Sequence, residues 1–176
     1  MKITAEACPH HLIFTETDLL RLGAYGIMKP PLGLPRDREA LWEGIRDGTI
    51  DIIATDHAPH SLEEKAGASP PFGVIGEPTL PVVWAAFHQR RLSIEDLVRM
   101  MYQRPAEIFD IHTDPDSYME VDLDETFEFK REMVQSKAGY SPYVGRRVRG
   151  RIHRIVLHGT EVMRDGKIIA RNGRVI

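Results

Sequence analysis

Apolar and polar positions are patterned differently in the two parts of the chain, and the first part has the pattern of an α/β protein. Residues 50–54 are mostly apolar between Gly48 and Pro59, which predicts a strand buried on both faces, as in a parallel sheet. Residues 2–8 predict an earlier strand, and residues 37–47 predict an amphipathic helix that ends at Gly48. A second short strand expected before residue 28, a loop over residues 28–33, this helix and the strand over residues 50–54 together predict a βαβ unit.

Short helices and loops are expected around this unit. Two prolines prevent regular structure in residues 28–33, which we expect to form a loop after a second short strand. Residues 61–76 are polar and long for a loop, which fits a lid or binding loop, although a plain surface loop has the same composition. Capping residues and prolines predict helices over residues 15–23, 77–91 and 93–104, the last one ending before Pro105.

Beyond about residue 112 the helical period gives way to the alternation of strands. Residues 119–129 alternate like a strand pair, and residues 153–169 predict two more strands joined across Asp165 and Gly166. We therefore expect a small β unit here. Five arginines in this part are interpreted as a solvated strand face rather than a nucleic-acid surface, because no aromatic residues alternate with them; they are Arg146, Arg147, Arg149, Arg151 and Arg154.

Ionisable residues follow the buried strand directly, in the pattern Asp56-His57-Ala-Pro-His60. Ligands of α/β folds bind outside the carboxyl ends of the strands, so these side chains are expected to project into a cleft. One carboxylate and two imidazoles suit a zinc site or acid–base catalysis. A turn and a helix cap use the same residue types, and the pattern alone leaves both interpretations open.

Two further histidines, His10 and His11, follow the first predicted strand. Neighbouring side chains on an extended segment point to opposite faces, so at most one of them would face a shared site. We therefore favour hydrogen-bonded structural histidines over metal ligands.

Composition narrows the class of protein. The chain has 176 residues, enough for one domain or slightly more, and its net charge of −3 gives no indication of nucleic-acid or membrane binding. No apolar run approaches a membrane span, nothing resembles a signal peptide, and the single Cys8 excludes an internal disulfide. A lone cysteine suits a reducing compartment, so we expect a cytoplasmic location.

Six segments form one series along the chain. They are Ala5–Leu12, Lys29–Leu32, Asp37–Trp42, Asp56–His60, Pro71–Gly73, and Ser136–Ala138 with Ser141–Tyr143. In this order and spacing the series resembles the second half of the dihydroorotases, a family of the amidohydrolase superfamily. The Asp-His-Ala-Pro-His segment is more typical of dihydroorotases than of the related hydantoinases and allantoinases.

The resemblance implies a fold and an activity. Residues 1–111 would form the last βα units of a (β/α)₈ TIM barrel, and residues 112–176 a small β-rich segment of a composite β-sandwich. The family catalyses the reversible cyclisation of N-carbamoyl-L-aspartate to L-dihydroorotate at a zinc centre, in pyrimidine biosynthesis. A homo-oligomer or a carbamoyltransferase partner would be compatible with this resemblance.

The resemblance also implies roles for single residues. Asp56 would be a metal ligand and the catalytic acid and base that delivers a proton to the amide nitrogen. His60 would contact the substrate, and Phe72 and Gly73 would offer backbone groups to the pyrimidine ring. The family does not use the two histidines that follow the first strand as metal ligands.

Two features depart from the family pattern. Lys29 and Gly33 stand where the family usually has Asn and Arg. Lys29 could pair with a substrate carboxylate in place of the Asn contact, and the alternative is a plain exposed loop lysine. The family's other zinc ligands, including a His-x-His pair, have no counterpart here, so we expect a fragment that is inactive alone. The alternatives are an inactive dihydroorotase-like partner of a carbamoyltransferase, and a hydantoinase or allantoinase.

Overall fold

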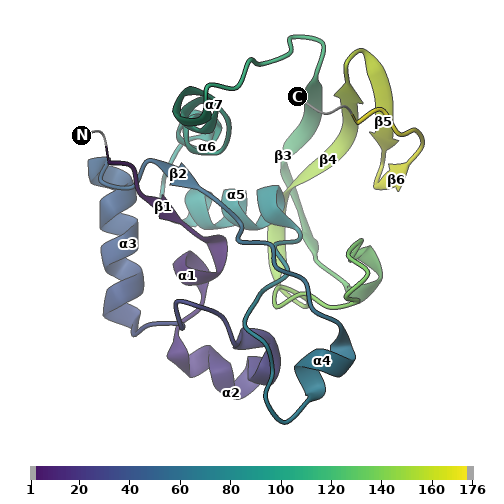
Figure 1. Cartoon of the computed structure of the whole chain (residues 1–176). Coiled ribbons are helices and arrows are strands. Elements are labelled where there is room, and N and C mark those ends of the chain that lie inside the picture. Colours follow the sequence, from purple (N-terminus) through teal and green to yellow (C-terminus); the bar gives the residue numbers. More distant parts are fainter. Residues whose placement is uncertain (1–2, 174–176) are drawn as a thin grey trace.

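The chain has a mixed α/β part and an antiparallel sheet, seen in a computed structural model that describes residues 3–173 (Figure 1). The helices are α1 Pro9–Ile13, α2 Leu19–Leu22, α3 Pro35–Asp47, α4 Leu62–Ala66, α5 Thr79–Gln89, α6 Ile94–Val98 and α7 Arg104–Phe109. The strands are β1 Glu6–Ala7, β2 Ile52–Ile53, β3 Tyr118–Glu128, β4 Arg147–Leu157, β5 Thr160–Arg164 and β6 Lys167–Ile168. Short 3₁₀ turns cover Glu16–Asp18, Gly23–Gly26 and Arg131–Met133, and a π-helical turn covers Arg99–Gln103.

The predicted βαβ unit forms with a different first strand, because β1 takes the place of the strand expected before residue 28. β1 and β2 pair in parallel, with Ala7 opposite Ile53, and α3 lies between them in the chain. α3 ends at Gly48, whose φ of 81° is the left-handed conformation that a helix C-terminus favours. The buried indole of Trp42 on α3 donates a hydrogen bond to the carbonyl of Leu12 at 2.9 Å, which fastens α3 to α1.

Of the two strands predicted near the N-terminus, the first forms with shorter bounds and the second is absent. β1 is shorter than residues 2–8, because Pro9 opens α1 directly after Cys8, and proline is well suited to the first turn of a helix. Lys2 lies outside the described residues. The second short strand expected before residue 28 is the 3₁₀ turn Gly23–Gly26.

The predicted helices form with different bounds. The segment 61–76 contains α4, which begins at a capping box of Ser61 and Glu64, so it is not a loop throughout. The capping box at Ser93 opens α6 as predicted. The predicted end before Pro105 is wrong, since the chain continues through the π-helical turn into α7, where Pro105 occupies the first turn.

The C-terminal β unit is confirmed as an antiparallel sheet in the order β3-β4-β5-β6. Residues 119–129 form one long strand, β3, rather than a strand pair. Asp165 and Gly166 connect β5 and β6 as a hairpin, as the sequence predicts. Three of the five arginines, on β4, pair with acidic side chains: Arg149 with Asp124, Arg151 with Glu125 and Arg154 with Glu120. Arg146 precedes β4 and lies over the ring of Phe14 instead of on the strand face.

A hydrophobic core joins the two parts of the chain. α5 runs between the α/β part and the sheet (Figure 1). One cluster of buried residues contains Phe14 and Val82 from the first part together with Phe129, Tyr143 and Val148 from the second. Among the described residues, no helix is both long enough and apolar enough to cross a membrane.

Candidate functional site

The carboxyl ends of β1 and β2 lie at the same edge of the parallel pair and bring two chemically active residues near each other. Asp56 follows β2, is exposed, and has a φ of 47°, a left-handed conformation that turns the chain away from the strand direction. Cys8 follows β1 and is partly buried. Burial first, then the charges of Asp56 and Glu6, raise the pKa of the Cys8 thiol to about 11. The thiol is therefore protonated at neutral pH.

The segment after Asp56 is held by a second segment, residues 73–76. His57 pairs with Val74 in a parallel bridge, and the Ala58 N–H donates to the Val74 carbonyl at 3.0 Å. The Gly76 N–H donates to Nδ1 of His57 at 3.0 Å. One ring nitrogen of His57 is thus occupied in positioning this loop.

Gly73 and His60 are direct neighbours in this arrangement. Gly73 has a φ of 141°, and a Cβ there would lie 2.5 Å from the Ala58 carbonyl oxygen and 3.0 Å from the His60 ring. Only glycine permits this close approach. Nδ1 of His60 lies 3.6 Å from the Glu64 carboxylate, at the start of α4.

Lys29 and Phe72, predicted to bind substrate, also touch each other. The Lys29 ammonium lies 4.2 Å from the centroid of the Phe72 ring, and half of the Phe72 side chain is exposed. The attraction of a cation to an exposed aromatic face is worth about 0.5–1 kcal/mol. This contact brings the loop before α3 against the loop after α4.

A buried lysine that the sequence analysis did not single out organises these loops. Lys65 on α4 is only 1% exposed, and its ammonium donates to the carbonyls of Ile27, Pro71 and Gly73 at 3.1, 2.8 and 2.8 Å. The three donors of the ammonium match three acceptors, which compensates for its burial. No sequence signal distinguishes Lys65 from a solvated lysine, because its partners come from two separate loops.

The donors of this region fit only part of the coordination sphere of the zinc ion that the sequence resemblance implies. The exposed Asp56 carboxylate at a strand end suits one position in a zinc coordination sphere. Across residues 3–173, however, Asp56 belongs to no group of three His, Cys, Asp or Glu side chains that converge closely enough to hold an ion. Residues 3–173 therefore hold no complete centre around Asp56.

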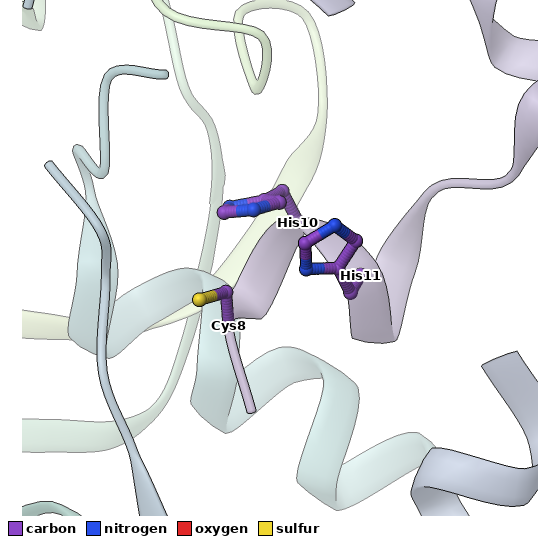
Figure 2. Close-up of side chains that lie close together, drawn as sticks. All are labelled: Cys8, His10 and His11. Atoms are coloured by element: carbon purple, nitrogen blue, oxygen red, sulfur yellow. The ribbon is translucent and has the colours of Figure 1, made fainter. Parts of the chain in front are cut away.

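A different group does converge, and it corrects the argument about the two adjacent histidines. Cys8, His10 and His11 bring one potential ligand atom each within 4.8 Å of one another (Figure 2). His10 and His11 lie in the helix α1 rather than on an extended segment, so their rings do not point to opposite faces, and the ring centroids are 4.2 Å apart. Burial, and secondarily His11, lower the pKa of His10 to about 3.

Comparison with known proteins identifies relatives of the chain by sequence. No family model matches the chain. The chain is 43% identical to the multifunctional protein pyr1-3 of Dictyostelium discoideum over 98% of its own length and 8% of that protein. It is 41% identical to a dihydroorotase of Staphylococcus epidermidis over 94% of its own length and 41% of that enzyme. The chain is homologous to dihydroorotases.

Solved structures support the same relationship at the level of the fold. An L-hydantoinase of Arthrobacter aurescens superimposes with a TM-score of 0.85 at 28% identity, over 95% of this chain and 40% of the hydantoinase. An inactive dihydroorotase-like domain of Chaetomium thermophilum superimposes with a TM-score of 0.72 at 24% identity, over 96% of this chain and 46% of that chain. The chain thus shares its fold with a hydantoinase and a dihydroorotase-like domain, and it spans less than half the length of these relatives.

Proposed function

We propose that this dihydroorotase homologue carries the substrate-binding loops and the acid–base residue of a zinc-dependent dihydroorotase, which interconverts N-carbamoyl-L-aspartate and L-dihydroorotate. In this proposal, residues 1–111 are the last βα units of a (β/α)₈ barrel, and residues 112–176 belong to a small β-sandwich. The identity to curated dihydroorotases supports the activity, and the whole reaction belongs to a polypeptide that holds a complete centre.

The observation that carries the proposal is the convergence of residues from separate loops. The ammonium of Lys29 contacts the ring of Phe72, and Gly73 abuts His60, which lies four residues after Asp56. The buried Lys65 holds the loops that present them. Such a cluster beside a strand end is where an α/β fold binds small molecules.

Each residue has a chemically reasonable role in ring opening. Lys29 pairs with the carboxylate of the substrate, and His60 contacts the ring. The Gly73 N–H donates weakly to Ile27 at 3.3 Å and its carbonyl accepts from Lys65, so the backbone of Phe72 is freer to meet the ring. Asp56 takes a proton from the attacking water and delivers it to the amide nitrogen as the C–N bond breaks.

A bound zinc ion would lower the pKa of water from 15.7 to about 7 and polarise the scissile carbonyl. Asp56 would be one of its ligands, and coordination would place the carboxylate beside the water whose proton it moves. A homo-oligomer, a carbamoyltransferase partner and a cytoplasmic location remain proposals that accompany this function.

The test is a chimera in which residues 1–176 replace the matching segment of the Staphylococcus epidermidis dihydroorotase. We expect the chimera to form dihydroorotate from N-carbamoyl-aspartate, and Asp56→Asn to lower kcat by about 10²–10⁴, the usual contribution of a general acid or base. Glu95→Gln, on the exposed side of α6, is the matched control and should leave the rate unchanged.

The opposite outcome is equally informative. A folded, zinc-loaded chimera without activity would contradict the proposal and favour an inactive partner subunit. Turnover of a hydantoin or allantoin instead of dihydroorotate would change the ring but keep the roles. A smaller exchange of residues 56–76 alone, which carry Asp56, His60, Phe72 and Gly73, keeps the test decisive if the larger chimera does not fold.

A further inference from the structure

We propose that Cys8, His10 and His11 form a separate binding site for a divalent transition-metal ion, with Zn²⁺ as the ion that this donor set suits best. One thiol and two imidazoles are zinc ligands, and their potential ligand atoms converge within 4.8 Å (Figure 2). Three protein ligands leave a fourth position open, as in zinc sites that bind water or substrate. The site does not use Asp56.

The state of His10 is the first independent observation for this site. Its side chain is fully buried, and neither ring nitrogen has a hydrogen-bond partner within the described part of the chain. A buried imidazole without partners is unusual, because an unsatisfied buried polar atom costs about 1–3 kcal/mol. Coordination of an ion by one of these nitrogens would remove part of that cost.

The orientation of His11 is the second observation. Its Nε2 lies 2.9 Å from the Pro30 carbonyl oxygen. A carbonyl only accepts, so Nε2 carries the proton and Nδ1 keeps a free lone pair. Metal-binding histidines almost always donate their other N–H in this way, which fixes the ring and makes the ligating nitrogen more basic.

Charge and access also suit a cation. On binding, the Cys8 thiol would lose its proton to solvent as the sulfur–metal bond forms, so a dication and one thiolate leave a net charge of +1. The carboxylates of Glu6 and Asp56 lie near enough to Cys8 to influence its ionisation, and they would offset that charge. A groove of about 530 Å³, lined in part by Cys8, His11 and Pro30, reaches the site from solvent.

The test is a titration of the purified chain with Co²⁺, followed by absorption spectroscopy. We expect one equivalent of Co²⁺ to give a thiolate-to-cobalt charge-transfer band, and added Zn²⁺ to abolish it by displacement. Cys8→Ser should remove the band. His11→Asn should lower the affinity for Co²⁺ by ~10–100-fold or more, because losing only an outer hydrogen-bond partner of a metal ligand already costs that much. Far-UV circular dichroism verifies that each variant is folded.

Two controls separate this site from the proposed catalytic one. His88→Asn, an exposed histidine on α5, and Asp56→Asn should both bind Co²⁺ like the unmodified chain. The absence of a charge-transfer band in the unmodified chain would overturn the proposal, as would unchanged binding by folded His11→Asn. Loss of the band in Asp56→Asn would overturn it in another way, by assigning the ion to a site that includes Asp56.

Discussion

Lys65 shows how much a single buried residue contributes to the arrangement of the loops. Replacing it with methionine keeps most of the volume but leaves the carbonyls of Ile27, Pro71 and Gly73 without their donor. We expect Lys65→Met to lower the free energy of unfolding by about 3 kcal/mol, measured by urea denaturation. Lys167→Met, at an exposed position in β6, is the matched control and should stay within about 0.5 kcal/mol of the unmodified chain. An equal change in the free energy of unfolding for the two substitutions would show that the Lys65 contacts contribute nothing to stability.

Single residues also mark the limit of prediction from sequence. The position of Asp56 shortly after a strand could be predicted, because the apolar run before it is local and ends two residues before the carboxylate. The burial of Lys65 and the convergence of Cys8 with His10 could not, because both depend on where Pro9 turns the chain and on which loops fold over it. The predicted roles of Lys29, His60, Phe72 and Gly73 stay predictions, although their mutual contacts favour a common site.

At the scale of elements, an ion pair between Glu39 on α3 and Arg90 at the end of α5 gives a prediction about pH. Hydrogen bonding to Arg90 lowers the pKa of Glu39 to about 2 from its ordinary value of 4.5. A carboxyl whose pKa is lower in the folded chain adds stability above its unfolded pKa, and this stability is lost as the pH falls from about 4.5 through about 2. Glu39 is 44% exposed, so solvent screening limits the effect to about 1 kcal/mol or less.

The measurement is the thermal midpoint as a function of pH. Glu39→Gln should be less stable than the unmodified chain at neutral pH and should lose less stability on acidification, because it has no charge to protonate. Glu43→Gln, an exposed substitution on the same helix, controls for the change in net charge. Parallel pH profiles for the unmodified chain and Glu39→Gln would contradict the prediction.

The elements themselves were predicted well where the signal is local. The periodicity of α3, the capping box of α6 and the Asp165-Gly166 turn all depend on neighbouring residues, and all three are confirmed. Two of the errors lie at prolines: Pro9 opens α1 where a strand was predicted to end, and the helical chain continues through Pro105 where a helix was predicted to end. Proline is compatible with a helix start and with a chain break, and only the packing of the whole chain decides between them.

At the scale of the whole molecule, the two parts of the chain share side-chain packing. The Trp84 indole on α5 donates to the Leu123 carbonyl of β3 at 3.0 Å, and a Cβ on Gly150 of β4 would lie 3.1 Å from the same ring. α5 therefore rests directly on the sheet, and the boundary proposed at residues 111 and 112 divides the sequence within one shared core. Structures that share a core are expected to unfold together.

This sharing predicts a single cooperative transition. Val148→Ala removes two methyl groups from the buried face of β4 and should lower the free energy of unfolding by about 2 kcal/mol. Because Trp84 contacts the sheet, the fluorescence of Trp42 is read in a Trp84→Phe background and reports on the first part, while hydrogen exchange of the β3 and β4 amides reports on the second. The free energy of unfolding obtained from each probe should fall by the same amount in Val148→Ala. Val98→Ala, at an exposed position on α6, should change neither value appreciably. A shift confined to the sheet amides would mean that the β unit unfolds independently, and that the contacts of α5 with it do not couple the two parts.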